Sequence, residues 1–349
     1  MPRPRSVSEE PLTADRLLAL VRAFGGRRIV VVGDLLADEF IYGRVERVSR
    51  EAPVLILRYD QTIVLPGGAG NAAANAAALG GRVTLAAQVG GDPVGRRLVA
   101  SLPPRISRTA LVRPRGYDTP LKTRILAGGV HSAKQQVVRI DRVRSSPPAP
   151  STVQTITRAA KTALATADAV LISDYGSGLV TPNLVESLRL HLKRVARGRR
   201  VPILLDSRHD TLRYRHLTAC TPNESEVEQL LGVSIDDRLD VLERAGRVVL
   251  KRTGMQAVLI TRGGRGMALF ESGAPTRHIA IYGSDEIADV TGAGDTVIAT
   301  LTLALAAGAS FYEAAHLANY AGGLVVMKRG TATVSPAELG AAIRRDLGR

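Results

Sequence analysis

Several residue types are scarce in this sequence, and each scarcity excludes a class of protein. The single cysteine, Cys220, allows no intrachain disulfide, so the chain is not a small secreted protein held together by disulfides. There is no tryptophan, and aromatic residues make up only 3% of the chain. A core built from Ala, Val, Leu and Ile favours α/β layering, because small side chains let helices lie close to a sheet.

Long apolar runs are also missing. No apolar run reaches the ~18 residues that a membrane-spanning helix needs. The first residues, MPRPRSVSEEP, are polar and lack the apolar segment of a signal peptide. We therefore expect a cytoplasmic protein with no membrane partner.

Acidic residues are in deficit, at 32 against 47 Lys and Arg, which gives a formal net charge of +15. Such an excess raises the question of a nucleic-acid partner. The basic residues are scattered, however, with small clusters only at Arg27-Arg28 and at 193–200, and no basic stripe alternates with aromatic residues. The charge therefore favours an anionic small substrate, such as a nucleotide or a sugar phosphate, over a nucleic acid.

What the sequence does contain is a regular alternation of strand and helix patterns. The apolar, β-branched run at 28–32 ends in Gly33 and is typical of a buried parallel strand. From about residue 151 onward, helices and strands alternate, which predicts a parallel sheet covered on its faces. The expected helices are 13–24, 152–165, 181–198, 224–231, 237–251 and 297–307, and the other expected strands are 169–173, 202–206 and 257–261. We predict one α/β domain over residues 1–349.

Two pairs of alternating segments predict a second, smaller sheet. The first pair is 40–45 with 54–59, and the second is 121–126 with 136–140. We expect this sheet, formed by approximately 38–60 and 117–141, to stand apart from the core as a lid. Exposed lid strands would also allow two subunits to pair, so we expect a homodimer.

The strongest chemical feature is DVTGAGDT, Asp289 to Thr296, before an Ala-rich helix. Small residues at a helix start, here Gly292, Ala293 and Gly294, let backbone N–H groups approach an anion, which the helix dipole favours. Asp295 directly follows them, and its carboxylate can accept the proton of a hydroxyl that attacks a phosphoryl group. The alternative is a Gly-rich loop in which Asp295 only caps the helix.

A second feature is PGGAGNAAANAAALG, residues 66–80. Gly67 and Gly68 would allow close approach of the backbone, and Asn71 and Asn75 lie one helical turn apart on the same face. This arrangement suits a polyhydroxylated ligand held by amide groups. The alternative is a helix of small residues that packs tightly on a sheet.

Two further segments suit a nucleotide. In TPNESEVEQL, the residues Asn223, Glu224, Ser225 and Glu226 open a helix, where they either cap it or hold metal-bound water near phosphates. The segment TRGGRG, 261–266, follows a strand but lacks the Lys-Ser/Thr pair of a P-loop. No GxGxxG motif follows the first strand either, so both common nucleotide-binding motifs are missing.

In order and context, these four features resemble the ribokinase (phosphofructokinase-B, PfkB) family of carbohydrate kinases. GAGD resembles the signature that supplies the anion hole and the catalytic base, and residues 66–80 resemble the other signature of that family. Asn223 with Glu226 matches its Asn-x-x-Glu motif, and 261–266 matches its Thr-x-Gly-x-x-Gly motif. The resemblance runs from about Ile29 to Leu339 and implies a ribokinase-like three-layer sandwich with a mostly parallel central sheet and a small β-sheet lid.

The resemblance also implies roles for individual residues. Asp295 would be the general base, and the Gly292–Gly294 amides would stabilise the transferring phosphoryl group. ATP would lie beside Thr261, Gly263, Gly266 and Asn319. Mg²⁺ would be held by Glu226, directly or through water, and K⁺ near Asp289 and Thr291.

A narrower resemblance is visible in GDLLADEFIYG, ERVSREAPV, KQQVVRID, DYGSGL and GTATVSPAEL. These segments are similar to the kinases of this family that phosphorylate D-glycero-D-manno-heptose 7-phosphate at its 1-position and supply lipopolysaccharide precursors. The implied contacts with the sugar and its 7-phosphate are Asp34, Asp38, Gly67, Gly68, Asn71, Lys122, Arg124, Gln136 and Arg139. Bifunctional relatives carry an adenylyltransferase domain after the kinase, and here we expect that activity from another protein.

The sequence departs from those relatives after the strand at 203–205, where Asp206-Ser207-Arg208 stands in place of Asp-Pro-Lys. Arg and Lys are not interchangeable as phosphate partners. Another sugar or a nucleoside as substrate therefore stays an alternative. A catalytically silent nucleic-acid-binding or regulatory protein on the same fold is a second alternative, against which the intact Asp295 and its glycines argue.

Overall fold

A large, mostly parallel sheet forms the centre of the molecule. The structure is a computed structural model that describes residues 12–128, 134–143, 146–283, 290–328 and 331–348. Within these residues the strand order is β14-β13-β12-β11-β10-β9-β1-β4-β5, with β6 also paired to β4. The core strands are β1 (Arg28–Gly33), β4 (Arg82–Gln88), β5 (Ile106–Ser107), β6 (Leu111–Val112), β9 (Ala169–Asp174), β10 (Ile203–Ser207), β11 (Ala219–Cys220), β12 (Ala257–Thr261), β13 (Met267–Glu271) and β14 (Arg277–Ile279). β13 is antiparallel to both β12 and β14, whereas the other described strand pairs of this sheet are parallel.

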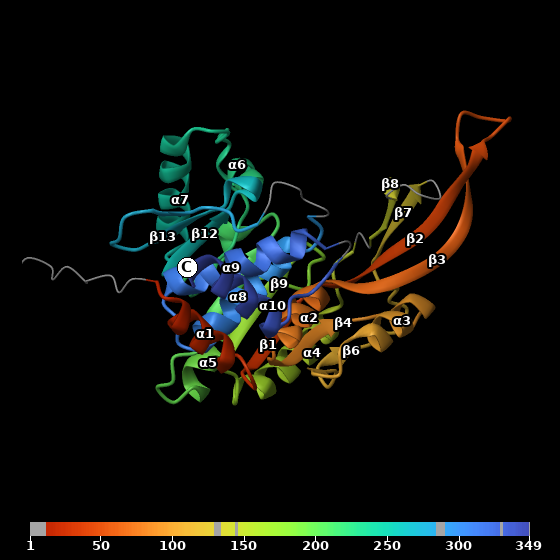
Figure 1. Ribbon diagram of the computed structural model, residues 1–349. Coiled ribbons are helices and arrows are strands. Elements are labelled where there is room, and N and C mark those ends of the chain that lie inside the picture. The colour runs from red at the N-terminus through yellow and green to blue at the C-terminus, as the bar shows by residue number, and fades with distance from the viewer. Residues whose placement is uncertain (1–11, 129–133, 144–145, 284–289, 329–330, 349) are drawn as a thin grey trace, which may run out of the picture.

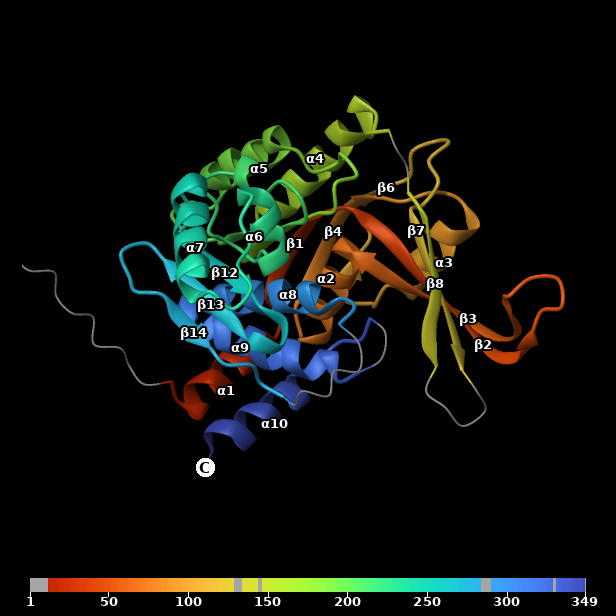
Figure 2. The same cartoon turned by 90° about the horizontal axis from the view of Figure 1, so that it is seen from above.

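Helices cover both faces of this sheet, which gives the expected three layers (Figures 1 and 2). One face carries α1 (Ala14–Ala23), α2 (Ala69–Ala78), α8 (Ala293–Ala306), α9 (Phe311–Val326) and α10 (Pro336–Leu347). The other carries α4 (Pro150–Leu164), α5 (Pro182–Val195), α6 (Glu224–Leu231) and α7 (Leu239–Thr253). No helix of the described segments has both the length and the apolar character that crossing a bilayer requires.

The position of α8 in the core is set by its composition. Val297, Ile298 and Leu301 are buried, and so are the threonines that alternate with them. The hydroxyl groups of Thr300 and Thr302 donate to the carbonyls one turn earlier, at 2.8 and 2.7 Å, so they add no unsatisfied polar group to the core. An apolar helix of this kind is stable only when surrounded, and α8 lies between the sheet, α2 and α9.

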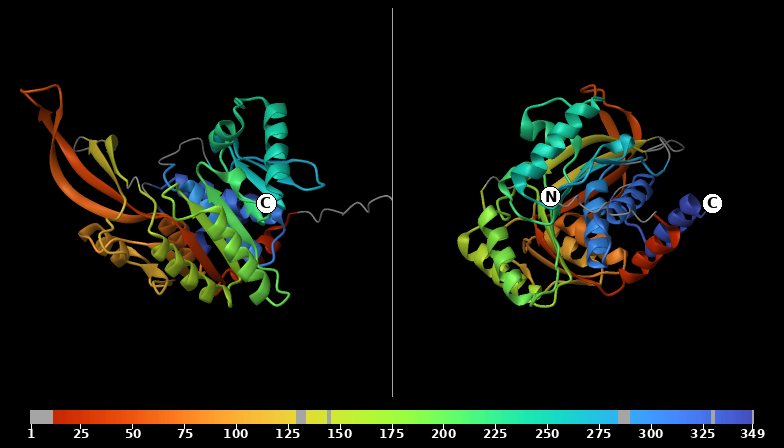
Figure 3. Two further views of the ribbon diagram at one scale, coloured as in Figure 1. Left: turned by 180° about the vertical axis from the view of Figure 1, so that it is seen from behind. Right: turned by 90° about the vertical axis from the view of Figure 1, so that its left-hand side faces the viewer.

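The lid is a four-stranded sheet that projects from the core (Figures 1 and 3). It contains β2 (Leu35–Val48), β3 (Leu55–Gly68), β7 (Leu121–Gly128) and β8 (Gln135–Arg142), in the order β3-β2-β7-β8. α3 (Pro93–Ser101) lies beside its base. All described residues of β8 are exposed, whereas the first residues of β2 are buried where the lid meets the core.

Two expected boundaries were wrong. The first lid hairpin is longer than the segments 40–45 and 54–59, because Leu35 pairs with Gly68 and Leu36 with Gly67 at its buried base. Gly67 and Gly68 therefore end β3, and Gly68 (φ 57°) is also the N-cap of α2, so the expected start of a helix after the two glycines is confirmed. The helix after DVTGAGDT begins at Ala293 and not at Val297, since Gly292 adopts a left-handed conformation (φ 80°) and its carbonyl accepts the Thr296 N–H at 3.1 Å.

Candidate active site

A cavity of about 300 Å³ opens at the carboxyl ends of the parallel strands. Asp174, Asp206, Thr221 and Thr261 line it, and each lies at or directly after the end of a core strand. The lid contributes Asp38 and several basic side chains to the opposite wall. Open α/β sheets place their ligands at this edge, so the cavity is the candidate active site.

Asp295 lies at the floor of this cavity, in the first turn of α8, and is 4% exposed. Its Oδ2 accepts from Asn71 Nδ2 at 2.8 Å, and its Oδ1 accepts from the Tyr175 hydroxyl at 3.1 Å. Burial raises the pKa of Asp295 to about 7, although both hydrogen bonds oppose this shift. The N-cap of α8 is Gly292, and among the described residues the hydrogen bonds of the Asp295 side chain go to Asn71 and Tyr175, so the interpretation of Asp295 as a simple N-cap was wrong. A carboxyl group with this pKa is suited to take up a proton near neutral pH.

The turn before Asp295 requires glycine. Gly292 has φ 80°, and a Cβ there would lie 2.4 Å from Asn71 Nδ2. Gly292 and Gly294 line the cavity, whereas the Ala293 N–H already donates to the Val290 carbonyl at 3.3 Å. An anion at this helix start would therefore meet the backbone of the two glycines.

Asn71 and Asn75 share one face of α2, as their spacing predicts. Asn75 Nδ2 donates to Asn71 Oδ1 at 3.1 Å, and Asn75 Oδ1 accepts from the Thr296 hydroxyl at 3.0 Å. All three side chains are buried. This buried network holds in place the Asn71 amide, which donates to Asp295. Asn71 does not itself line the described cavity wall, so it acts on the site through this hydrogen bond.

Gly67 and Gly68 are buried at the base of the lid. A Cβ on Gly67 would lie 2.3 Å from Asp38 Oδ2, and a Cβ on Gly68 would lie 2.5 Å from the Asp34 carbonyl. These glycines therefore let β3 lie close against Asp34, directly before β2, and against the Asp38 side chain of β2.

Four basic side chains line the cavity, namely those of Lys122, Arg124, Arg139 and Arg208. Arg124 forms a buried ion pair with Asp38. Lys122 Nζ lies 5.5 Å from the centre of the Tyr175 ring, and burial together with the neighbouring Arg208 lowers the pKa of Lys122. Concentrated positive charge of this kind is suited to a phosphorylated substrate. Gln136 lies on exposed β8, opposite Leu126, and is not part of the described cavity wall.

Asn223 and Glu226 both cap α6 and line the cavity. The Glu226 N–H donates to Asn223 Oδ1, and the Asn223 N–H donates to Glu226 Oε2, both at 2.9 Å. Burial raises the pKa of Glu226. Thr221 is buried beside them, and its Oγ1 has no hydrogen-bond partner among the described residues. A ligand with polar groups would satisfy that hydroxyl.

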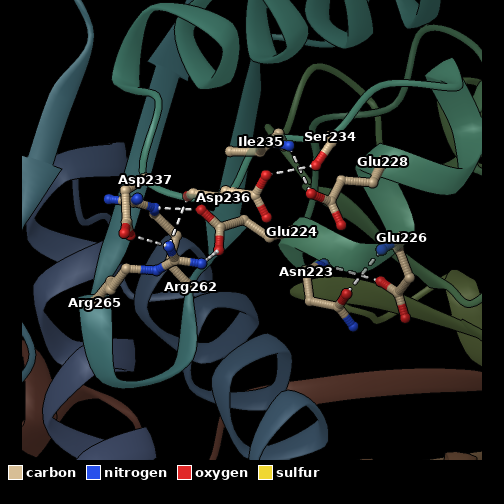
Figure 4. A network of polar contacts seen from close by, with 10 residues as sticks. All are labelled: Asn223, Glu224, Glu226, Glu228, Ser234, Ile235, Asp236, Asp237, Arg262 and Arg265. Carbon is tan, nitrogen blue, oxygen red and sulfur yellow. Dashed lines mark hydrogen bonds and ion pairs between the residues drawn. The ribbon is translucent and has the colours of Figure 1, made fainter.

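Glu224 points away from this pair, as Figure 4 shows. Its carboxylate accepts from Arg262 Nε at 2.7 Å and also binds Arg265, whose other nitrogen lies 2.6 Å from Asp237 Oδ1. The side chains of Glu224 and Arg262 are only 10% and 8% exposed. Glu224 therefore connects the start of α6 to the loop 261–266 through ion pairs. Glu224 itself is not part of the described cavity lining.

The other residues expected to bind ATP are Gly263 and Gly266 in this loop, together with Ser225 and Asn319. Gly263 and Ser225 are exposed, and Gly266 is buried with φ 80°, where a Cβ would lie 2.1 Å from the Ile279 carbonyl. Asn319 is buried, and its Nδ2 donates to the Ala280 carbonyl at 2.8 Å. Of the residues expected to contact the nucleotide, Asn223, Glu226 and Thr261 line the described cavity.

Sequence reasoning did not assign a role to Tyr175, Asp206 or Thr221. Burial and the charges of Asp295 and Glu226 raise the pKa of Asp206 well above its ordinary value. Each of these residues lies inside a segment quoted above, DYGSGL, Asp206-Ser207-Arg208 or TPNESEVEQL, but nothing in the spacing of those segments singles it out. The only available signal was its place at the end of a predicted parallel strand, where ligands gather.

The metal sites implied by the resemblance can be tested against these residues. The described segments hold no cluster of three His, Cys, Asp or Glu side chains arranged for a metal ion. Mg²⁺ with a nucleotide needs only one or two protein carboxylates, because phosphates and water complete its shell. Glu226 fits this requirement. Of the residues expected near K⁺, Thr291 lines the cavity, and Asp289 lies outside the described residues.

Comparison with known proteins decides the family. The model of the pfkB family of carbohydrate kinases matches residues 27–338. The chain belongs to this family. As a pfkB carbohydrate kinase it is an ATP-dependent phosphotransferase with a sugar hydroxyl as acceptor, which confirms the resemblance read from the four motifs.

Curated relatives of this pfkB kinase include bifunctional proteins named HldE. The protein from Desulfatibacillum aliphaticivorans is 40% identical over 326 residues, which cover 93% of this chain and 64% of the relative. The protein from Caulobacter vibrioides is 40% identical over 328 residues, with coverages of 93% and 65%. The chain thus spans just under two thirds of the length of these relatives.

Solved structures confirm the fold class. Phosphofructokinase-2 from Escherichia coli in complex with potassium matches with a TM-score of 0.72 at 18% identity, covering 93% of this chain and all of that one. Arabidopsis thaliana ribokinase complexed with ribose and ATP matches with a TM-score of 0.69 at 19% identity, covering 91% and 99%. At this identity the likeness shows a ribokinase-like fold for the pfkB kinase.

Proposed function

We propose that this pfkB kinase transfers the γ-phosphoryl group of ATP to the anomeric 1-hydroxyl of D-glycero-D-manno-heptose 7-phosphate, forming the 1,7-bisphosphate, a precursor of lipopolysaccharide. The observation that supports it best is the placement of Asp295. This buried carboxyl group, with a pKa of about 7, lies in a cavity whose wall carries Lys122, Arg124, Arg139 and Arg208. The HldE relatives at about 40% identity favour a heptose phosphate as the substrate.

The sugar phosphate would lie between the lid and the floor of the cavity. Lys122 and Arg139 from the lid, with Arg208 from the core, supply positive charge for the 7-phosphate. Arg124 is already paired with Asp38, so we propose that this pair presents oriented donors and acceptors to the sugar hydroxyls. Lid strands above the site would exclude water and so suppress hydrolysis of ATP.

In the transfer itself, Asp295 accepts the proton of the 1-hydroxyl while that oxygen forms a bond to the γ-phosphorus. The bond from the γ-phosphorus to the oxygen that bridges to the β-phosphate breaks, and ADP leaves with that oxygen. The backbone at Gly292 and Gly294, at the positive end of α8, stabilises the charge on the transferring group. Mg²⁺, held with the help of Glu226, would neutralise phosphate charge when bound.

A coupled ADP-release assay tests this proposal. The acceptors are the heptose 7-phosphate, the same heptose without phosphate, ribose and a nucleoside, each with ATP and Mg²⁺. We expect selective turnover of the heptose 7-phosphate, and a fall in kcat of ~10²–10⁴-fold in Asp295→Asn, the range of a general base. Asp118→Asn, at an exposed position, is the control. Near-normal turnover by Asp295→Asn would contradict the assignment of the base, and turnover of ribose or the nucleoside alone would contradict the substrate.

Three further expectations from the sequence stay predictions. These are a cytoplasmic location, activation by K⁺ near Asp289 and Thr291, and a homodimer formed through the lid. The potassium complex of the E. coli phosphofructokinase-2 supports a test of K⁺, in which turnover is compared in potassium and in a tetraalkylammonium salt of equal ionic strength.

A further inference from the structure

Asp34 was expected to contact the sugar, but its carboxylate is occupied by the protein. The side chain is 4% exposed and lies outside the described cavity wall. Its Oδ2 accepts the backbone N–H groups of Tyr175 and Ser177, at 2.9 and 3.0 Å. Its Oδ1 accepts the Ser177 hydroxyl. Asp34 therefore holds the turn that follows β9.

Tyr175 is the residue of this turn that reaches the site. Its hydroxyl donates to Asp295 Oδ1 at 3.1 Å, and its ring lies 5.5 Å from Lys122 Nζ and 5.9 Å from the guanidinium of Arg208. The Tyr175 hydroxyl can donate one hydrogen bond, and it donates that bond to Asp295 Oδ1. Asn71 occupies the other oxygen, so the carboxylate has two donors and a defined orientation.

We propose that Tyr175 positions the base Asp295 for proton transfer, and that Asp34 acts on the reaction through Tyr175 instead of by contacting the sugar. The inference rests on the proposed function, in which Asp295 is the base. A hydrogen bond donated by Tyr175 stabilises the ionised carboxylate of Asp295 relative to its protonated form. Removing the hydroxyl should therefore make Asp295 harder to ionise while leaving the cavity wall in place.

Other charged groups also act on Asp295, and they must stay constant in any test. Asp38 from the lid disfavours its ionised form and Lys122 favours it. Asp206, at the end of β10, and Asp295 each disfavour ionisation of the other. Arg208 acts on Asp206 and on Tyr175. Tyr175→Phe changes none of these charges, because the tyrosine is neutral and burial raises its pKa further.

The first test is the pH profile of kcat/KM for the sugar phosphate. In Tyr175→Phe we expect the acid limb to move to higher pH by about 1–2 units, the usual effect of one hydrogen bond to a charged group. Much of the loss in rate should disappear as the pH rises. A tyrosine that only packs against the cavity would leave the limb in place.

The Asp34→Asn variant distinguishes an action of Asp34 through Tyr175 from a direct contact of Asp34 with the sugar. The variant replaces one acceptor oxygen by an N–H donor that faces the Tyr175–Ser177 turn, so the turn should loosen and the acid limb should shift in the same direction. We expect the double variant Asp34→Asn/Tyr175→Phe to shift no further than the larger single shift, since both act on one contact. A raised KM for the sugar with an unmoved acid limb would instead show a direct sugar contact and overturn the proposal.

Two further variants serve as a substitute for Asp34→Asn and as a control for Tyr175→Phe. Ser177→Ala removes one of the three donors to Asp34 and should give a smaller shift of the same sign if Asp34→Asn fails to fold. Tyr320→Phe is the matched control, because it removes a tyrosine hydroxyl that donates to a carboxylate at 2.5 Å, that of Asp346. This pair joins α9 to α10 away from the described cavity wall, so its loss should not move the profile.

A measurement without substrate distinguishes this inference from the proposed function. Carboxyl ¹³C NMR follows the titration of Asp295 in the free protein, with the signal assigned by its loss in Asp295→Asn. Tyr175→Phe should raise that titration midpoint by the same 1–2 units. An unchanged midpoint overturns the inference even if the kinase is active. A raised midpoint in a protein that phosphorylates no sugar supports the Tyr175 contact and rejects the proposed function.

Discussion

At the scale of single residues, the burial of Asp295 links the proposed activity to a loss of stability. Its pKa rises from an ordinary value of 3.8 to about 7 in the folded protein. Between these values the unfolded chain has already released the proton that the folded chain still holds. The contribution of Asp295 to the free energy of unfolding therefore falls as the pH rises through this window.

This linkage predicts the thermal behaviour of Asp295→Asn. The variant cannot titrate at this position, so its Tm relative to the unaltered protein should increase from pH 5 to pH 8. Differential scanning fluorimetry at constant ionic strength measures the difference. Asp34 and Glu226 also have raised pKa values, but they are common to both proteins and cancel to first order. The charge of Asp295 helps to raise the pKa of Asp206, so its removal lowers the pKa of Asp206 and changes the Tm difference in the same direction. Asp118→Asn, at an exposed position, is the control, and a Tm difference independent of pH for Asp295→Asn would contradict the prediction.

The residues of the site differ in how far the sequence revealed them. Asp295 and Asn71 stand in motifs whose small residues and spacing have a physical reason, and the structure brings Asn71 Nδ2 to 2.8 Å from Asp295 Oδ2. Tyr175 and Asp206 lie far apart in the chain and meet only because β9 and β10 are neighbours in the sheet. Such proximity depends on strand order, which local patterns do not encode.

At the scale of elements, the ion pairs of Glu224 connect α6 to the loop 261–266. In Glu224→Gln we expect the free energy of unfolding to fall by about 1–3 kcal/mol, because Arg262 loses a charged partner in a buried position. The loop should also loosen, so KM for ATP should rise more than kcat falls. Chemical denaturation and initial-rate kinetics measure the two effects.

The matched control for this variant is Arg244→Gln. It removes an exposed pair with Asp240, at 2.8 Å within α7, which is worth only ~0.3–0.5 kcal/mol. Equal effects of the two variants, or a Glu224→Gln protein with an unchanged KM for ATP, would show that the loop does not depend on Glu224.

Element boundaries were predictable where local chemistry marks them. The expected helix 224–231 agrees with α6, because Asn223 and Glu226 form a capping box and Gly232 ends the helix in a left-handed conformation. The base of the lid hairpin was missed because both faces are buried there, which removes the alternation of polar and apolar residues. The Pro66-Gly67-Gly68 run resembles a turn in sequence, yet it pairs with Ala37, Leu36 and Leu35.

At the scale of the whole molecule, the lid exposes apolar side chains that a monomer would leave in water. Its hairpin end and outer strand include the exposed residues Val48, Val54, Leu55, Tyr59, Val137, Val138 and Ile140. β3 and β8 are also the edges of the lid sheet. Unpaired edges with apolar side chains are suited to pairing with another copy, which supports the proposed homodimer.

Placing a charge on this surface tests the dimer. Ile140→Lys should convert the dimer to a monomer in sedimentation velocity experiments, because a lysine would have to be desolvated in the contact. Leu190→Lys is the control, since Leu190 is 45% exposed on α5, away from the lid. A protein that sediments as a monomer before any substitution, or a dimer that Ile140→Lys leaves intact, would contradict a contact through the lid.

The parallel pairing of β2 with β7 also predicts an order of folding. β2 and β3 form a hairpin from neighbouring segments, whereas Ala37 pairs with Leu121 across an intervening segment that contains α2, β4, α3, β5 and β6. Closing such a long loop is slow, and it becomes favourable once the intervening elements have docked. During refolding, the amides of β7 and β8 should therefore gain protection from hydrogen exchange late, after those of the central strands. The β2–β3 hairpin would then form before β7 can pair with it, so a newly made chain would expose one edge of β2 until the core has formed.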